Sequence, residues 1–172
     1  MALKPLFHLI LLGVLLVGGC GYQLRGRETN LPPGIHSLAI PIFANRTDQT
    51  GVETDVTQAL TAKFISSKRM AVTTRNSADA LLTGTVISFS TNPVAVTPST
   101  QVSTEYRATL TVGFTFQGLK DGKVLYREEM SEWRNYPVVS DLNTTEQNKQ
   151  EAIRRISVLL AERIHELILG GF

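Results

Sequence analysis

The most regular stretch of the chain reads Tyr106-Arg107-Ala108-Thr109-Leu110-Thr111-Val112-Gly113-Phe114-Thr115-Phe116-Gln117. Apolar side chains occupy every second position and alternate with polar ones, several of which are threonine. Because successive side chains of a strand point to opposite faces, the pattern predicts a strand with one apolar and one polar face. The apolar face needs a cover of other elements, whereas the threonine-rich face can stay exposed.

The segments on both sides of this strand predict the rest of a sheet. Three further strands are expected at Ile35–Phe43, Ala78–Phe89 and Val124–Tyr136, with a short extended piece at Met70–Thr74. Asp121-Gly122 is a hairpin signal between the last two strands. Pro41 has no N–H group, so the first strand is expected at an edge or with a bulge there.

Two segments have the apolar period of amphipathic helices. The first follows Thr50-Gly51-Val52-Glu53, which has capping-box spacing, and its stripe consists of Val52, Val56, Ala59, Leu60 and Phe64. The second helix has a capping signature at Asn143–Glu146 and can end at Gly170-Gly171. Its apolar stripe consists of Ala152, Ile153, Ile156, Leu159, Leu160, Ile164, Leu167 and Ile168.

The predicted order of elements is β-α-β-β-β-α, with one right-handed crossover followed by an antiparallel meander. Two helices with one apolar face each must cover the apolar face of the sheet. The fold class is therefore α/β (α+β): a two-layer sandwich with a mostly antiparallel four-stranded sheet covered by two helices on one face. Residues 35–172 are expected to form this single domain.

The segment from Ser90 to Thr104 is rich in serine and threonine and has two prolines and no charge. We predict a long loop there. Long loops in compact domains are usually mobile or functional. The segment can be a flexible tip or a contact loop that enters a partner, and the sequence leaves both open.

Cys20, the only cysteine, follows an apolar run from Leu6 to Val17 and two glycines, and Lys4 supplies a positive charge before the run. This order is typical of a bacterial lipoprotein signal, and the run is too short for a membrane span. We expect residues 1–19 to be the signal peptide and Cys20 to carry the N-acyl and S-diacylglycerol chains. Gly21 stands where an aspartate would favour retention in the inner membrane. The predicted location is the outer membrane, lipid-anchored, on the periplasmic side.

Residues 20–34 would form the lipidated N-terminus and a short tether, which reaches roughly 50 Å when fully extended. This reach keeps the domain near its membrane and favours a membrane-embedded partner. The alternative is a lipoprotein that regulates a cell-wall synthase, although such a protein would usually have a longer tether. The chain has 17 basic and 15 acidic residues, a balance that argues against nucleic acid as the main partner.

Four motifs together resemble the LPS-assembly lipoproteins of the LptE family. They are Gly21-Tyr22-Gln23-Leu24-Arg25-Gly26, Phe43-Ala44-Asn45-Arg46-Thr47, Ala78-Asp79-Ala80-Leu81-Leu82-Thr83-Gly84 and Glu105-Tyr106-Arg107. The resemblance implies a small α/β sandwich that plugs the outer-membrane β-barrel LptD and helps to deliver lipopolysaccharide to the cell surface. Lipopolysaccharide, the barrel and the outer-membrane bilayer are the partners that it implies.

The resemblance also implies contacts with lipopolysaccharide through basic side chains near loops of the sheet. The candidates for phosphate binding are Arg107, Lys120, Lys123 and Arg134. They lie on the two strands of the meander and at the hairpin between them. Neither Ser90–Thr104 nor Val138–Thr145 contains a lysine or arginine, so these segments offer no such contact.

Motifs for catalysis or for a cofactor do not occur in the sequence. There is no pair of Cys or His at metal-binding spacing, no phosphate-binding loop and no nucleophile elbow. Beyond the signal, the histidines are His36 and His165, and we expect His165 at the surface or boundary of the last helix. We therefore predict a protein that is no enzyme and needs no cofactor or metal.

Overall fold

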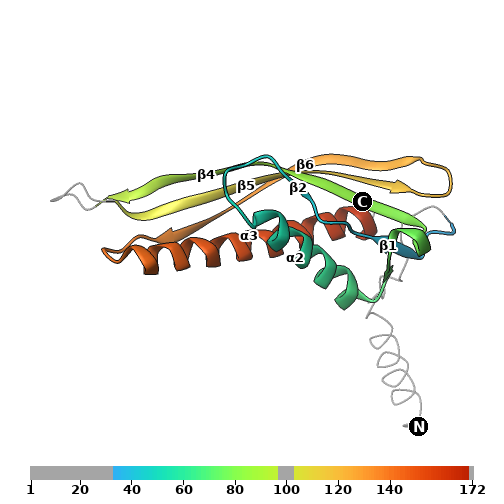
Figure 1. Cartoon of the computed structure of the whole chain (residues 1–172), viewed down its shortest axis with the longest axis horizontal. Helices are drawn as coiled ribbons and strands as arrows, with labels where there is room; N and C mark the ends of the chain where they lie inside the picture. Colours follow the sequence, from blue (N-terminus) through green and yellow to red (C-terminus); the bar gives the residue numbers. More distant parts are fainter. Residues whose placement is uncertain (1–32, 97–102, 171–172) are drawn as a thin grey trace, which may run out of the picture.

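The computed structural model describes residues 33–96 and 103–170, which fold into two layers. One layer is a long, twisted sheet, and the other consists of two helices that pack on one of its faces (Figure 1). The elements are β1 Ser37–Ala39, β2 Ala44–Asn45, α2 Val52–Ser67, β3 Ala71–Val72, a 3-10 turn at Arg75–Ser77, β4 Ala80–Val96, β5 Ser103–Gly118, β6 Val124–Pro137 and α3 Leu142–Gly170. The predicted class, a two-layer α+β sandwich with two helices on one face, is confirmed.

The sheet has six strands among the described residues rather than the predicted four. Its order is β3-β1-β4-β5-β6, and β2 also pairs with β4. The pairs of β1 with β3 and β4, and of β2 with β4, are parallel. The long pairs β4–β5 and β5–β6 are antiparallel, so the sheet is mixed.

The predicted first strand is divided at Pro41. β1 ends at Ala39 and β2 begins at Ala44. Proline cannot donate to a strand ladder, and the N–H of Phe43 donates to the Thr57 hydroxyl of α2 at 3.1 Å instead. β1 lies between β3 and β4, so the expectation of an edge position was wrong for this half.

The prediction of a long loop at Ser90–Thr104 was also wrong. β4 continues to Val96 and β5 begins at Ser103, so most of the segment belongs to a hairpin, with residues 97–102 outside the described part. Two shifts in register, around Pro93 and Ala95, let the ladder continue through this stretch. Because of these shifts, apolar and polar residues do not alternate regularly in the sequence here, although β4 and β5 remain paired.

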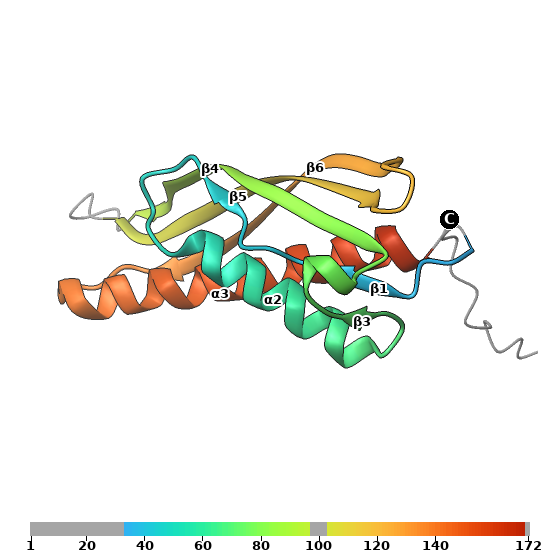
Figure 2. The same ribbon diagram turned by 45° about the vertical axis from the view of Figure 1, so that its right-hand side comes forward.

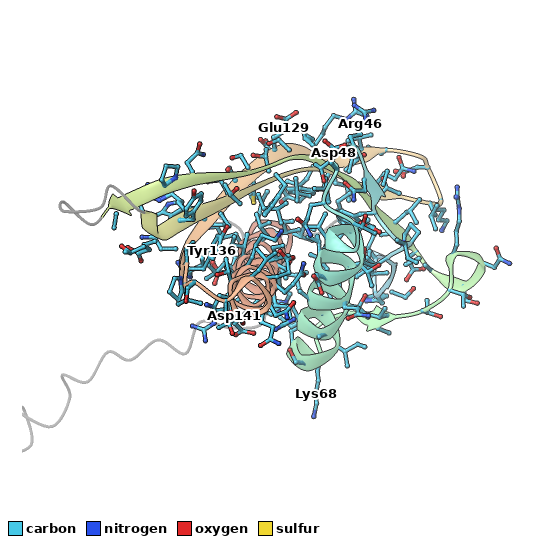
Figure 3. The ribbon with its side chains drawn as sticks, turned by 60° about the vertical axis from the view of Figure 1, so that its left-hand side comes forward. Arg46, Asp48, Lys68, Glu129, Tyr136 and Asp141 are labelled. Atoms are coloured by element: carbon cyan, nitrogen blue, oxygen red, sulfur yellow. The ribbon has the colours of Figure 1, made fainter. Side chains whose placement is uncertain are left out.

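The alternating residues of β5 face as predicted. Its inward side chains are at most 3% exposed and belong to the core: Ala108, Leu110, Val112, Phe114 and Phe116. In Figure 3, side chains fill the space between the sheet and the helices, while Arg46 and Glu129 lie on the far side of the sheet. Both helical stripes are confirmed, except that Leu159, Leu167 and Ala59 are only partly buried.

Both helices begin differently from the predictions. Gly51 precedes α2 with φ of 89° and no side-chain cap, since the Glu53 carboxylate accepts a hydrogen bond from Asn45 Nδ2 at 2.8 Å. Before α3, the Asp141 carboxylate accepts hydrogen bonds from the N–H and hydroxyl of Thr144 at 2.7 and 2.5 Å. These bonds lower the pKa of Asp141 below its ordinary value. Asp141, not Asn143, is therefore the cap.

Two of the quoted motifs hold the chain where β1 and β2 join the sheet. Asp79 Oδ2 accepts hydrogen bonds from the Ser37 hydroxyl at 2.7 Å, the Ser37 N–H at 2.9 Å and the His36 N–H at 3.0 Å. The bonds from Ser37 and His36 lower the pKa of Asp79. Asn45 Oδ1 accepts bonds from the N–H and hydroxyl of Thr47 at 2.8 Å each. Both motifs thus have a structural role in this fold.

Candidate functional site

The side of β4, β5 and β6 that faces away from the helices is the strongest candidate for a functional surface. We call it the open face (Figure 2). Its residues alternate with the core residues of the same strands, in the register of the two antiparallel pairs. None of the serine and threonine side chains on it is buried. They are Thr83, Thr85, Ser88, Ser90, Thr109, Thr111, Thr115 and Ser131.

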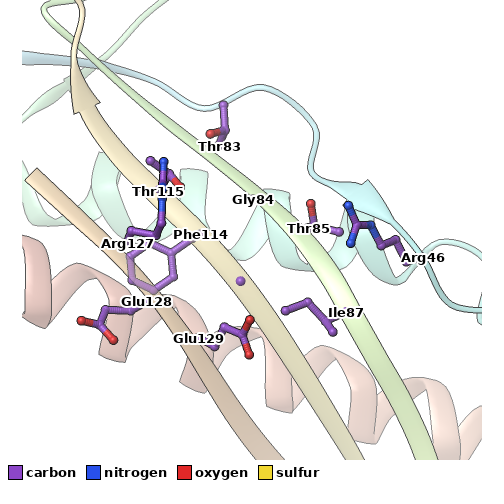
Figure 4. Close-up of a pocket in the computed structure, with 11 residues that line it drawn as sticks. Arg46, Thr83, Gly84, Thr85, Ile87, Phe114, Thr115, Arg127, Glu128 and Glu129 are labelled. Atoms are coloured by element: carbon purple, nitrogen blue, oxygen red, sulfur yellow. The ribbon is translucent and has the colours of Figure 1, made fainter. Parts of the chain in front are cut away.

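The half of the open face near the hairpin to β6 contains a groove of about 490 Å³. Gly113 forms part of its floor, where the Ile87 side chain lies 2.9 Å from the position that a Cβ would occupy. Arg46 and Arg127 lie on opposite sides of the groove, and Glu129 lies between strands β5 and β6 (Figure 4). We call this half the groove end. It carries charges of both signs.

The other half of the open face is built around an arginine stacked on a tryptophan. The Arg107 guanidinium lies 4.1 Å from the centroid of the Trp133 ring, and its Nε donates to Asn135 Oδ1 at 3.1 Å. The Trp133 side chain remains 46% exposed. A cation over an aromatic face stabilises both groups and orients them.

Hydroxyl and amide side chains surround this pair in the cross-strand register. We call these nine residues the Trp133 end: Ser88, Ser90, Asn92, Arg107, Thr109, Thr111, Ser131, Trp133 and Asn135. The Thr111 hydroxyl donates to the Ser131 hydroxyl at 3.2 Å. Arg107 is the only charged member. The carboxylates of Glu105 and Glu129 bound the group on its two sides.

The four basic residues predicted for phosphate binding do not gather in one place. Arg107 lies on the open face, whereas Arg134 pairs with buried Ala108 and therefore faces the helical side. Lys120 and Lys123 lie at the β5–β6 hairpin, about 40 Å along the strand from Arg107 at roughly 3.3 Å per residue. The four cannot act as one site.

His165 is buried rather than at the surface, which corrects the prediction. It is 7% exposed and packs edge-on against Phe64 of α2, with the ring centroids 5.1 Å apart. Burial, together with Lys63 and Arg69, lowers the pKa of His165 below its ordinary value. Its place between the two helices indicates a role in packing.

Cys20, the predicted site of lipid attachment, lies outside the described residues, as does the tether up to residue 32. Within residues 33–96 and 103–170, no three His, Cys, Asp or Glu side chains are close enough to hold a metal ion. No helix in the described part of the chain is long and apolar enough to cross a membrane.

Residues 35–168 match the LptE family, which is described as Lipopolysaccharide-assembly. The chain belongs to the LptE family. Its function at this level is lipopolysaccharide assembly, in a non-enzymatic family of outer-membrane lipoproteins that act with LptD. No curated protein matches the chain in sequence.

Solved lipoprotein structures share the fold of this LptE-family chain. Rare lipoprotein B from Shewanella oneidensis is 13% identical, with a TM-score of 0.53 over 74% of this chain and 91% of that one. Lipoprotein B from Nitrosomonas europaea is 15% identical, with a TM-score of 0.51 over 84% of this chain and 87% of that one. A minor lipoprotein from Acinetobacter baumannii is 15% identical, with a TM-score of 0.50 over 77% and 92%. At these identities the likeness shows the fold alone.

Trp133 and Asn135 are the site residues that sequence reasoning missed. β6 looks irregular because its inward side includes Glu128, Glu132 and Arg134. Pairing β6 with β5 through the Asp-Gly hairpin would have placed Trp133 beside Thr109 on the polar face. A lone tryptophan among hydroxyl residues was therefore a signal available in the sequence.

Proposed function

We propose that this chain is an outer-membrane lipoprotein, anchored through acylated Cys20, that docks in an LptD-type barrel and helps it deliver lipopolysaccharide. Membership of the LptE family supports this function, and the signal around Cys20 supports the anchor. Two or more acyl chains are needed for stable anchoring, because one chain binds a bilayer only marginally.

The observation that carries the docking proposal is the uncharged β4–β5 hairpin end. The described residues 90–96 and 103–104 include no ionisable side chain. Val94 is 42% exposed there. A neutral hairpin can be buried in a polar lumen without the free-energy cost of removing a charge from water.

Two more exposed aliphatic side chains lie at the same end of the domain. Val138 N–H donates to Thr104 O at 2.9 Å, which brings the start of α3 beside the hairpin. Val139 and Leu142 are 45% and 80% exposed in this connection. Apolar side chains gathered at one end favour contact with a partner.

The described chain enters the fold at the opposite end from this hairpin. β1 pairs with the first residues of β4, Ala80 and Leu81, whereas β4 ends at Val96, at the other end of the sheet (Figure 1). About 16 residues of strand, roughly 50 Å, separate the two ends. A tether at the β1 end leaves the hairpin end free to dock.

Lys120 and Lys123 remain a proposed contact for lipopolysaccharide phosphates, as a pair at the β5–β6 hairpin. Both side chains are exposed, and no ion pair neutralises either one within the described residues. Arg134 is a weaker candidate, because it faces the helical side and its terminal nitrogen donates to Trp133 O at 3.4 Å.

Shortening the hairpin tests the docking proposal. Replacing residues 97–102 of the full-length lipoprotein with an Asn-Gly turn should weaken co-purification with the barrel, while thermal melting stays cooperative. Reversing the charges of Lys120 and Lys123 together should reduce lipopolysaccharide binding and change barrel binding less. An intact complex after shortening would place the docking surface elsewhere. Capture of a cell-wall synthase instead of a barrel would contradict the function itself.

A further inference from the structure

We propose that the Trp133 end of the open face binds an acidic saccharide, namely the phosphate- or carboxylate-bearing sugars of the lipopolysaccharide core, outside lipid A. This inference rests on the proposed function, in which the chain handles lipopolysaccharide. It goes further by assigning the sugar portion of that molecule, rather than its acyl chains, to a defined set of side chains. The site is distinct from the lysine pair at the β5–β6 hairpin.

Trp133 offers a flat apolar surface for a sugar ring. It is the single tryptophan of the chain, and nearly half of its side chain is exposed on an otherwise polar face. A sugar ring has C–H groups on its faces and hydroxyl groups around its rim, so an aromatic plane can bury the former while polar neighbours bind the latter. Arg107 stacks on the ring at 4.1 Å and restricts its orientation.

Arg107 is held in place with part of its hydrogen-bonding capacity unused. Its Nε is bonded to Asn135 Oδ1 at 3.1 Å, and no described residue accepts a bond from its two terminal amino groups. A guanidinium binds a phosphate or carboxylate through two parallel hydrogen bonds. Because the stacking on Trp133 and the bond to Asn135 already order the side chain, less conformational entropy is lost on binding.

The charge distribution of the open face selects an acidic ligand at this end. Arg107 is the only charged residue of the Trp133 end, and no ion pair joins it to Glu105, two positions away on β5. Ser90 and Thr109 lie in register with Trp133, so their hydroxyl groups could bind the hydroxyl groups of a sugar stacked on Trp133. The lining of the groove end, in contrast, includes two carboxylates, Glu128 and Glu129, beside its two arginines, so no excess of positive charge favours an anion there.

Intrinsic fluorescence of Trp133 tests this site directly, because no other tryptophan contributes. The full-length lipoprotein in detergent is titrated with lipopolysaccharide that carries an acidic core saccharide, with lipid A lacking that core, and with a neutral oligosaccharide. We expect a saturable shift in emission with the first probe and little change with the other two. An equal shift with lipid A would assign the contact to acyl chains or lipid phosphates and overturn the proposal.

Variants of the two central residues provide the second measurement. We expect Arg107→Gln and Trp133→Leu each to weaken binding to immobilised lipopolysaccharide about tenfold, the first through the loss of one charge-assisted contact and the second through the loss of the aromatic plane. Trp133→Phe, which keeps an aromatic plane, should restore most of the binding. Arg75→Gln is the matched control, since Arg75 is an exposed arginine in the 3-10 turn away from the open face.

The outcomes separate this inference from the proposed function. If the unaltered protein fails to bind lipopolysaccharide, its proposed handling of that molecule is wrong and the inference falls with it. If it binds, and Arg107→Gln and Trp133→Leu bind equally well while thermal melts show folded protein, only the inference is wrong. If these variants still bind lipopolysaccharide but no longer co-purify with the barrel, the Trp133 end contacts protein and the inference is overturned.

Discussion

The two faces of β5 differ in exposure although they belong to the same sixteen-residue strand. Its inward residues pack against α3 and neighbouring strands and are almost completely buried. Its outward residues from position 107 to 117 are Arg107, three threonines, Gly113 and Gln117, none of which is buried. The inward face supplies stability and the outward face remains available for binding. Substitutions on the inward face should therefore reduce stability more than binding, and those on the outward face should reduce binding more than stability.

The largest expected effect comes from removing a core aromatic. Phe114→Ala should lower the free energy of unfolding by about 3–5 kcal/mol, because it removes buried apolar area and leaves a cavity. Thr111→Ala, three residues earlier on the open face, should cost less than about 1 kcal/mol. Urea denaturation of both variants compares the faces. Similar losses of stability in the two variants would mean that the assignment of β5 residues to the core and to the open face is wrong.

Glycines sharpen the same comparison. A Cβ at Gly84, on the helical side of β4, would lie 2.1 Å from Phe43 Cε2. Gly84→Ala should therefore cost about 1–3 kcal/mol through overpacking. At Gly113, on the open face, the Cβ would lie 2.9 Å from the flexible end of the Ile87 side chain and in ordinary contact with Glu129 Cγ at 3.6 Å, so Gly113→Ala should cost under about 1 kcal/mol. Thermal melting should therefore give a lower melting temperature for Gly84→Ala than for Gly113→Ala, and the reverse order would contradict the assignment of the two faces.

The pH dependence of stability should originate on the helical side. Burial lowers the pKa of His165 below 6.5, so on acidification the unfolded chain takes up this proton before the folded one does. Lowering the pH from about 7.5 to about 5.5 should therefore destabilise the fold, by up to about 1 kcal/mol. His165→Leu should reduce this loss in chemical denaturation. An unchanged pH profile in that variant would exclude His165 as its source.

The smallest effect on stability is expected at Arg107. An exposed cation–π contact contributes about 0.5–1 kcal/mol, so Arg107→Gln should lower the free energy of unfolding by no more than that. The same variant should bind lipopolysaccharide about tenfold more weakly. A large loss of stability would instead identify Arg107 as a structural residue. Equilibrium unfolding and binding are therefore measured on one preparation.

Regular periodicity explains what the sequence predicted correctly. The period of two in β5 and the period of 3.6 in both helices identified most of the core, because side-chain direction follows directly from backbone geometry. The predictions failed where local exceptions interrupt that geometry. Pro41 divides the first strand, and register shifts near Pro93 conceal the second half of β4.

The candidate site was harder to predict because it depends on pairing between strands. Arg107 was selected correctly as an open-face residue, but its partners Trp133 and Asn135 lie on β6, 26 and 28 residues away in the sequence. Lys120 and Lys123 were grouped with it although a long strand separates them. His165 was expected outside because position on a helix does not reveal how deeply a second helix covers it.

Photo-crosslinking in cells tests most directly whether the open face is the side that contacts lipopolysaccharide. A photoreactive residue replaces Thr111 on the open face or Val158 on α3, which is 50% exposed, in the full-length lipoprotein. Irradiation followed by detection of lipopolysaccharide-linked protein compares the two positions. We predict adducts at Thr111 and none at Val158. Adducts at Val158 with none at Thr111 would contradict the assignment and move the binding surface to the helices.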